Sequence, residues 1–151
     1  MNIFVVSPEP WKCANYLDDK RVIKMVLETA QLLATAVNVS GGKATYKTTH
    51  LNHPCSIWVR SSRANYKWTL ALFQELLREY ENRYGKIHKC RDYLLEFHEG
   101  QFLISEGELT PFVNCTPFKD EPNVFVAYKM CLDDKWKNDK RKPTWHKREA
   151  M

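Results

Sequence analysis

The sequence lacks the short motifs that carry the chemistry of several large enzyme classes. It has no Gly-rich phosphate loop, no nucleophile elbow and no His-Glu-x-x-His segment, which disfavours the familiar nucleotide hydrolases and metalloproteases. It also has no Cys-x-x-Cys pair, and its five cysteines are widely spaced and odd in number. We therefore expect neither a disulfide framework nor a thiolate zinc site, and we interpret most of the cysteines as small hydrophobic residues of the core.

Long apolar runs are absent as well. No stretch reaches the roughly 18 residues that a membrane span needs, so we predict no membrane partner. The first six residues have no basic flank and are too few for a signal peptide. Because cysteines without an evident pairing pattern also suit a reducing compartment, these absences predict a cytoplasmic protein.

What is present is typical of one globular domain. The chain has 151 residues, of which 44% are hydrophobic and 13% aromatic, enough to bury a core. We expect a compact single domain over residues 1–151 that is mainly α, with three principal helices and minimal strand content. The principal helices are expected at about 18–37, at 56–84 with Gly85 as the C-cap, and from 120–122 onward. Shorter helices are expected at 7–17 and 89–98, and residues 2–6 are a strand or a buried extended segment.

The net charge of the protein is concentrated at its carboxyl end. Residues 135–151 contain seven of the 23 Lys and Arg residues and two of the 18 Asp and Glu residues. This segment therefore carries the whole net charge of +5. Trp136 and Trp145 interrupt this basic segment. Basic side chains neutralise phosphates and aromatic rings stack on bases, so the segment indicates a surface that binds nucleic acid. The alternative is a solvated terminal tail.

A second cluster of charged residues opens the first long helix. It consists of Asp18, Asp19, Lys20, Arg21, Lys24 and Glu28. A carboxylate near a helix N-terminus and beside cations can act as a general base or steady a cationic intermediate, while the cations hold phosphates. Glu28 lies in an otherwise apolar stretch, where a partly buried carboxylate is either paired or functional. The alternative is an ordinary ion pair, since Lys24 and Glu28 are four residues apart.

Two further groups are candidates for nucleotide contacts. The first is a loop with His50, Asn52 and His53, and the second is the pair Arg60 and Arg63 at the start of the second long helix. Loops on a rigid scaffold often bind ligands, and cations three residues apart share a helix face that can line a phosphate groove. The alternatives are a turn that shapes the helix entry and a solvated face. A metal at the two histidines and Cys55 lacks a fourth ligand, so we predict no metal and no cofactor.

Several segments resemble the small phage pyrimidine-dimer DNA glycosylases, often called endonuclease V. The resemblance rests on residues 16–22 (Tyr-Leu-Asp-Asp-Lys-Arg-Val), residues 132–135 (Leu-Asp-Asp-Lys) and residues 141–145 (Arg-Lys-Pro-Thr-Trp). The long helix closed by Gly85 is similar in length and place. As a whole, the chain is also similar to uncharacterised small phage proteins that carry the same Asp-Lys-x-Val-x-Lys-Met and Asn-His-Pro segments.

The resemblance implies a helical domain that binds double-stranded DNA, cuts the glycosidic bond of a damaged pyrimidine and then nicks the backbone in an AP-lyase step. The family's nucleophile is an N-terminal amine exposed by removal of Met, and its catalytic acid is a Glu in the first helix. Here Asn2 is bulky, so we expect Met1 to be retained and to supply the amine. Asp18 best matches the position of the Glu, with Asp19 as the near alternative, and Arg21 matches a family arginine.

We therefore predict a monomeric DNA glycosylase, acting in the host cytoplasm if it is phage-encoded, whose site lies where the start of the chain, the helix opening and the histidine loop meet. The predicted catalytic residues are Met1, Asp18, Asp19 and Glu28. The predicted DNA-binding residues are Lys20, Arg21, Lys24, His50, Asn52, His53, Arg60, Arg63, Trp136 and Trp145. The alternatives are a phage protein that binds DNA or inhibits a host factor without catalysis, and a transferase that acts on modified DNA bases.

Overall fold

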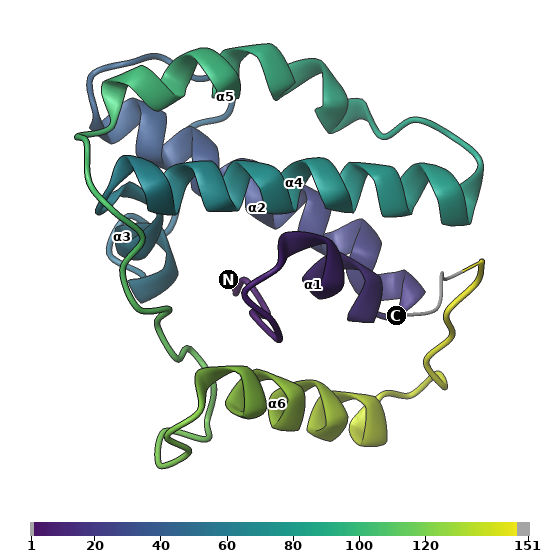
Figure 1. Ribbon diagram of the computed structural model, residues 1–151. Helices are drawn as coiled ribbons and strands as arrows, with labels where there is room; N and C mark the ends of the chain where they lie inside the picture. The colour runs from purple at the N-terminus through teal and green to yellow at the C-terminus, as the bar shows by residue number, and fades with distance from the viewer. Residues whose placement is uncertain (1, 148–151) are drawn as a thin grey trace.

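The computed structural model describes residues 2–147, and this part of the chain is helical and contains no strand (Figure 1). Its α-helices are α1 (Pro10–Tyr16), α2 (Asp19–Val39), α3 (Pro54–Arg60), α4 (Arg63–Tyr84), α5 (Leu94–Gly100) and α6 (Val124–Asn138). Two short 3-10 helices, η1 (Lys89–Tyr93) and η2 (Gln101–Leu103), flank α5. The predicted mainly α fold is confirmed, with α2, α4 and α6 as its three long helices.

The core lies between α2 and α4, which run across each other in the middle of the molecule with α1, α3 and α5 around them (Figure 1). Each of the two long helices contributes an apolar stripe. Val22, Val26 and Leu33 of α2 are fully buried, as are Tyr66 and Phe73 of α4. Burying a large apolar side chain stabilises a fold by about 1.5–3 kcal/mol. This packing therefore sets the positions of both helices and of the charged residues near their ends.

The helix predicted over residues 56–84 is in fact two helices, α3 and α4. The chain is interrupted at Ser62, which has extended backbone and whose Oγ accepts a 3.1 Å hydrogen bond from the backbone N–H of Asn65, as an N-cap does. The buried Asn65 amide also donates to the Trp58 carbonyl at 2.9 Å, which holds the end of α3 against the start of α4. Apolar periodicity reports which face is buried and not whether the backbone is continuous, so the break was missed. The other end was predicted correctly, because Gly85 closes α4 in left-handed backbone with φ 69°.

Both ends of the described chain pack onto the helical body. Residues 3–6 are buried and form no strand, and α1 begins after Glu9 rather than at the Ser7 expected from the sequence. At the other end, residues 139–147 leave α6 and return toward α1 and the opening of α2, where backbone hydrogen bonding holds them (Figure 1). The basic segment is therefore a docked part of the fold as far as Lys147.

One helix, α2, is long and apolar enough to cross a membrane if only its length and composition are considered. Its most apolar window has a mean hydropathy of 1.3, and 61% of that window is buried inside the protein. A buried core helix passes the same test, so the finding is weak evidence for a membrane span.

Candidate active site

Asp19 ties the carboxyl-terminal segment to the opening of α2. Its carboxylate accepts hydrogen bonds from the Thr144 hydroxyl at 2.6 Å and from the His146 backbone N–H at 3.0 Å, and its own N–H donates to the Thr144 carbonyl at 2.9 Å. Arg83, whose side chain is completely buried near the end of α4, pairs with the same carboxylate at 3.2 Å. Burial opposes the charge on Asp19, but the hydrogen bonds from Thr144 and His146, together with the Arg83 guanidinium, hold its pKa below the ordinary value.

Asp18, the residue before Asp19, is held by a different set of partners. The Trp136 indole N–H donates to its Oδ1 at 2.8 Å, and an Arg21 nitrogen lies 3.3 Å from the same oxygen. Arg21 also makes a two-pronged pair with Asp139, with nitrogen–oxygen distances of 2.8 and 3.1 Å. This pairing raises the pKa of Arg21 and lowers that of Asp139. Both predicted catalytic aspartates, Asp18 and Asp19, are thus buried and connect α2 to the basic segment.

The two tryptophans of the basic segment use their indole groups to anchor it. Trp145 donates its N–H to the Tyr16 carbonyl at 3.1 Å, and its ring meets that of Trp136 edge to face with centroids 5.0 Å apart. The basic side chains of the segment are exposed as far as Lys147, the last residue that the structure describes. Lys20, Arg141 and Lys142 border a hollow of about 260 Å³ beside Asp18 and Asp19. The start of α2 and the basic segment therefore lie side by side, with Lys20, Arg141 and Lys142 at the border of the hollow that they share.

A smaller hollow of about 160 Å³ lies along the next turns of α2. It is lined by Asn2, Phe4, Arg21, Lys24, Met25, Glu28 and Lys135. Three of these residues, Arg21, Lys24 and Glu28, are three and four positions apart, so one face of α2 presents them together, while Lys135 comes from α6. One carboxylate and three cations thus meet where the described chain begins. Such a set can hold a polyanion and place an acid–base group beside it.

The backbone next to this hollow is strained. Phe4 has a φ of 41°, which is uncommon for a bulky residue and costs roughly 1–3 kcal/mol. The Asn2 side chain holds this turn, because its Oδ1 accepts from the N–H groups of Ile3 at 2.7 Å and Phe4 at 2.9 Å. Backbone strain of this kind is concentrated at functional sites, which adds weight to the hollow as the active site.

None of the residues predicted in the histidine loop lines either of these two hollows. His50 is exposed in left-handed backbone with φ 49°, and Asn52 is exposed beside it. His53 is the N-cap of α3, with its Nδ1 accepting from the Cys55 N–H at 3.1 Å, and burial lowers its pKa below the ordinary value. In this structure the loop shapes the entry to α3, which is the alternative that the sequence left open.

The two arginines predicted to share a helix face lie on different helices, so the shared face was wrong. Arg60, at the end of α3, donates to the Leu51 carbonyl at 2.9 Å and to Ser56 Oγ at 3.1 Å. Arg63, at the start of α4, donates to the Gln101 carbonyl at 3.0 Å and pairs with Glu106 at 3.2 Å. Both guanidinium groups fasten neighbouring loops to the helices.

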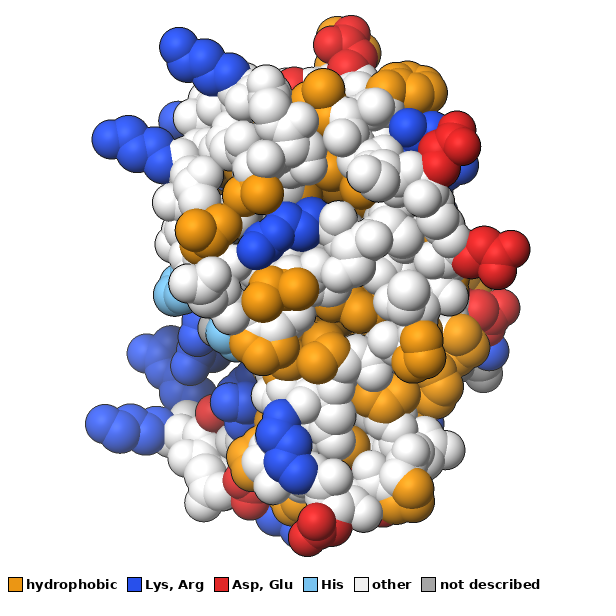
Figure 2. Space-filling view, turned by 90° about the vertical axis from the view of Figure 1, so that its left-hand side faces the viewer, with side chains coloured by type: hydrophobic (Ala, Val, Ile, Leu, Met, Phe, Trp, Pro, Cys, Tyr) orange, Lys and Arg blue, Asp and Glu red, His pale blue; other side chains and the backbone are white. Residues whose placement is uncertain are grey.

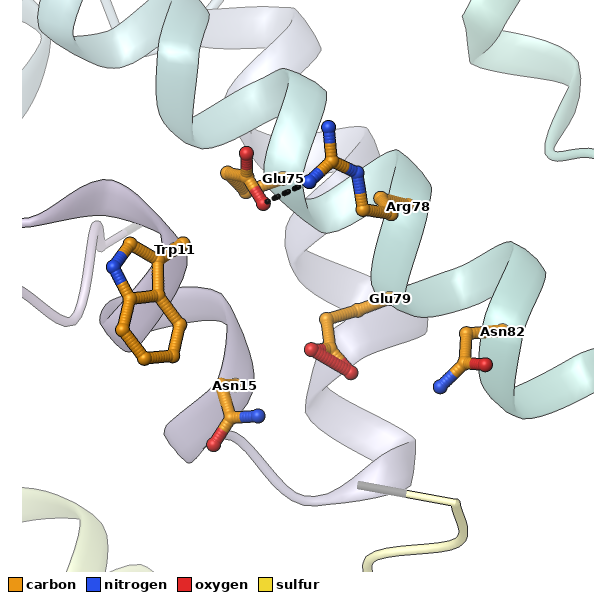
Figure 3. A pocket seen from close by; sticks show the side chains of 6 residues that line it. All are labelled: Trp11, Asn15, Glu75, Arg78, Glu79 and Asn82. Atoms are coloured by element: carbon orange, nitrogen blue, oxygen red, sulfur yellow. Dashed lines mark ion pairs between the residues drawn. The ribbon is translucent and has the colours of Figure 1, made fainter. Parts of the chain in front are cut away.

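A further cavity of about 370 Å³ lies between α1 and α4 (Figure 3). Its lining residues are Trp11, Asn15, Glu75, Arg78, Glu79 and Asn82. Arg78 is paired with Glu75 at 3.6 Å, so the cavity has no surplus of cations for a phosphate. None of the residues predicted from the sequence lines it.

Charge is unevenly spread on the surface that carries α3 and the segment leading to α6. In Figure 2 most basic side chains gather toward one edge of this face, with histidine side chains next to them, while acidic side chains lie mainly along the other edge and at the two ends. A surface divided in this way orients an approaching polyanion.

Comparison with known proteins assigns the family. A family model described as pyrimidine dimer DNA glycosylase matches residues 1–92. The chain belongs to this family. The match includes the residues of the 160 Å³ hollow except Lys135, and it confirms the resemblance seen in the sequence. No curated protein and no solved structure matches the chain.

In this member of the family, the sequence predicted some of the residues around the 160 Å³ hollow and missed others. Of the predicted catalytic residues, Met1 lies outside the described residues and Glu28 lines the hollow. Asn2 and Phe4 were missed, since no local pattern distinguishes them from other residues of a buried segment. The role of Arg83 as the buried partner of Asp19 was also missed, because the two residues are brought together only by the packing of α4 against the start of α2.

Proposed function

We propose that this glycosylase cleaves the N-glycosidic bond of a damaged pyrimidine in double-stranded DNA at the 160 Å³ hollow. The observation that supports the proposal is the meeting of Glu28 with Arg21, Lys24 and Lys135 beside the start of the chain, largely within the segment that the family model matches. Chemistry on a base requires the damaged nucleotide to leave the stack, which brings its sugar and flanking phosphates to the protein surface.

Glu28 is the acid–base group of the proposed reaction. Its carboxylate steadies the positive charge that develops at C1′ as the bond to the base breaks. The amine of Met1, the residue that precedes Asn2 in the sequence, is the proposed nucleophile that forms the new bond to C1′. Opening of the sugar ring gives a Schiff base. Removal of a proton from C2′ then forms a C2′–C3′ double bond and expels the 3′ phosphate, which is the lyase step. Asp18 and Asp19 contribute by holding the helix opening and the basic segment together.

The cations divide into two groups along the proposed DNA path. Lys24 and Lys135 hold the phosphates next to the reacting sugar, beside Arg21 in its pairs with Asp18 and Asp139. The exposed basic side chains of residues 140–142 hold the duplex farther along. We propose that the protein acts as a monomer in the cytoplasm, since its family of DNA repair enzymes suggests a soluble intracellular protein.

Removing cations from the hollow should weaken DNA binding in a salt-dependent way. Each phosphate that the protein no longer neutralises makes the slope of log K against log salt concentration shallower by about 0.9. We therefore expect the slope to become shallower by about 1 for Lys24→Ala or Lys135→Ala and by about 2 for the double variant, measured by fluorescence anisotropy on a short duplex. Lys43→Ala, in the loop beyond the far end of α2, is the control and should leave the slope unchanged. Equal slopes for the unmodified protein and all of these variants would mean that DNA phosphates do not contact this hollow.

The decisive experiment is a cleavage and trapping assay. Duplexes with one cyclobutane pyrimidine dimer, one abasic site or no lesion are incubated with the protein, with and without borohydride. We expect cleavage of the dimer-containing duplex and a covalent adduct on the dimer and abasic substrates, because borohydride reduces a Schiff base to a stable amine. A strand break that appears only after alkali treatment, with no covalent adduct, would indicate a glycosylase that uses water and leaves an abasic site. Binding without any cleavage would contradict the proposal and favour a non-enzymatic DNA-binding protein.

A further inference from the structure

Two cysteines that are far apart in the sequence face each other in the fold. Cys55 lies in the first turn of α3, and Cys115 lies in the segment between η2 and α6. Their sulfur atoms are 3.0 Å apart, with the Cys55 thiol donating to the Cys115 sulfur. The described residues include no disulfide, and the other three cysteines, Cys13, Cys90 and Cys131, are buried.

The two sulfur atoms have different surroundings. Cys55 is completely buried, whereas Cys115 is partly exposed. The hydrogen bond from Cys55, with contributions from Tyr128 and the Lys119 ammonium, outweighs burial and lowers the pKa of Cys115 to about 7. The same hydrogen bond, together with burial, raises the pKa of Cys55, which keeps it a protonated thiol. A partly exposed thiolate beside a buried thiol is the arrangement of an attacking and a resolving cysteine.

We propose that Cys55 and Cys115 are a redox-active pair that closes into a reversible disulfide when the protein meets a peroxide. The Cys115 thiolate attacks one oxygen of hydrogen peroxide, which gives a sulfenic acid and releases hydroxide. The Cys55 sulfur then attacks the sulfenic sulfur, forming the S–S bond and releasing water as its proton leaves. In total two thiols and one peroxide become one disulfide and two waters. A dithiol reductant reverses the change by exchange.

The short separation favours this pairing over a metal site. His53 lies near the two sulfurs, and the three ligand atoms are within 4.8 Å of one another. However, His53 Nδ1 already accepts the Cys55 N–H as the cap of α3, which leaves only Nε2 for a metal. The cluster then offers three ligands, whereas zinc in a structural site takes four. A sulfur–sulfur distance of 3.0 Å needs only a small side-chain movement to reach bonding distance.

The disulfide would join α3 to the segment that leads into α6. These two parts of the chain are held at this point by the packing around Tyr128, whose hydroxyl accepts from the Cys115 N–H at 3.1 Å and donates to the Val113 carbonyl at 2.6 Å. Closing a loop between residues 55 and 115 reduces the freedom of the unfolded chain, so the oxidised protein should be the more stable form. The inference is independent of the proposed DNA chemistry.

The test begins with the unmodified protein, so it does not depend on a variant that folds. After reduction and brief exposure to hydrogen peroxide, mass spectrometry should show the loss of two hydrogen atoms and one cross-linked peptide pair containing Cys55 and Cys115. Dithiothreitol should restore the original mass, and the oxidised form should have the higher Tm. In native alkylation with iodoacetamide, Cys115 should react at least ~10 times faster than the buried Cys13 and Cys131.

Variants then separate the two roles. Cys55→Ser should stop oxidation at a sulfenic acid on Cys115 that dimedone traps, whereas Cys90→Ser, the control, should form the disulfide as the unmodified protein does. Each of three outcomes would overturn the proposal: a different cysteine pairing, no cross-link after peroxide treatment, or stoichiometric zinc that protects both thiols and is lost in His53→Ala.

Discussion

Replacing Asp19 by Asn should destabilise the protein by about 3 kcal/mol at neutral pH. Removing one partner of a buried ion pair costs about 3–5 kcal/mol, because the other charge is left buried without compensation. The lower end of the range applies here, since Glu79 also pairs with Arg83 at 3.0 Å and stays in place. The change should be read from urea denaturation of the two proteins, with Asp133→Asn on the exposed face of α6 as a control that leaves the midpoint unchanged.

The difference in stability between the unmodified protein and Asp19→Asn should depend on pH in a defined direction. The pKa of Asp19 is below its ordinary value of 3.8, so its ionised form stabilises the folded state at any pH above that value. This stabilisation is lost as the pH falls through the lowered pKa, because the Asp19 carboxyl is then protonated in both the folded and the unfolded state. The stability gap between the unmodified protein and Asp19→Asn should therefore be constant from pH 5 to 7 and narrow below about pH 4. A gap that persists at pH 2 would mean that packing, and not charge, accounts for the loss.

Replacing Glu28 by Gln should reduce the rate of glycosidic bond cleavage by about 10²–10⁴-fold while DNA binding and Tm stay close to those of the unmodified protein. A positioned acid–base group contributes a factor of this size, and Gln keeps the shape of the side chain but loses its charge. The rate should be measured in single turnover on a duplex with one pyrimidine dimer, so that product release does not mask the chemical step.

A matched control distinguishes this effect from a general loss of charge. Glu99→Gln changes an exposed glutamate on α5 and should leave the single-turnover rate unaltered. If Glu28→Gln were fully active and Asp18→Asn inactive at unchanged stability, the acid role would belong to Asp18, as its position in the resemblance implies. That result would also require Asp18 to leave Trp136 and Arg21 when DNA binds.

Some residues of the candidate site can be predicted from the sequence, and others are known only from the tertiary structure. Glu28 was singled out because a carboxylate in the run between Met25 and Ala30 conflicts with its apolar surroundings, and that conflict is visible in the sequence. The same reasoning could not separate Asp18 and Asp19 from Glu28, because all three lie near the opening of one helix beside cations. Only the tertiary structure shows that Trp136 donates a hydrogen bond to Asp18, and that Thr144 and Arg83 bind the carboxylate of Asp19.

The sequence by itself determined the helical class, the approximate places of the long helices, the glycine that ends α4, and the concentration of positive charge at the carboxyl end. These features are local, because helix period, capping and charge depend on residues within a few positions of one another. The tertiary structure decided the break before α4, the docking of the basic segment on the start of α2, and the meeting of Asn2 and Lys135 beside Glu28. Those contacts join residues up to more than a hundred positions apart, and which of them form depends on how the whole core packs.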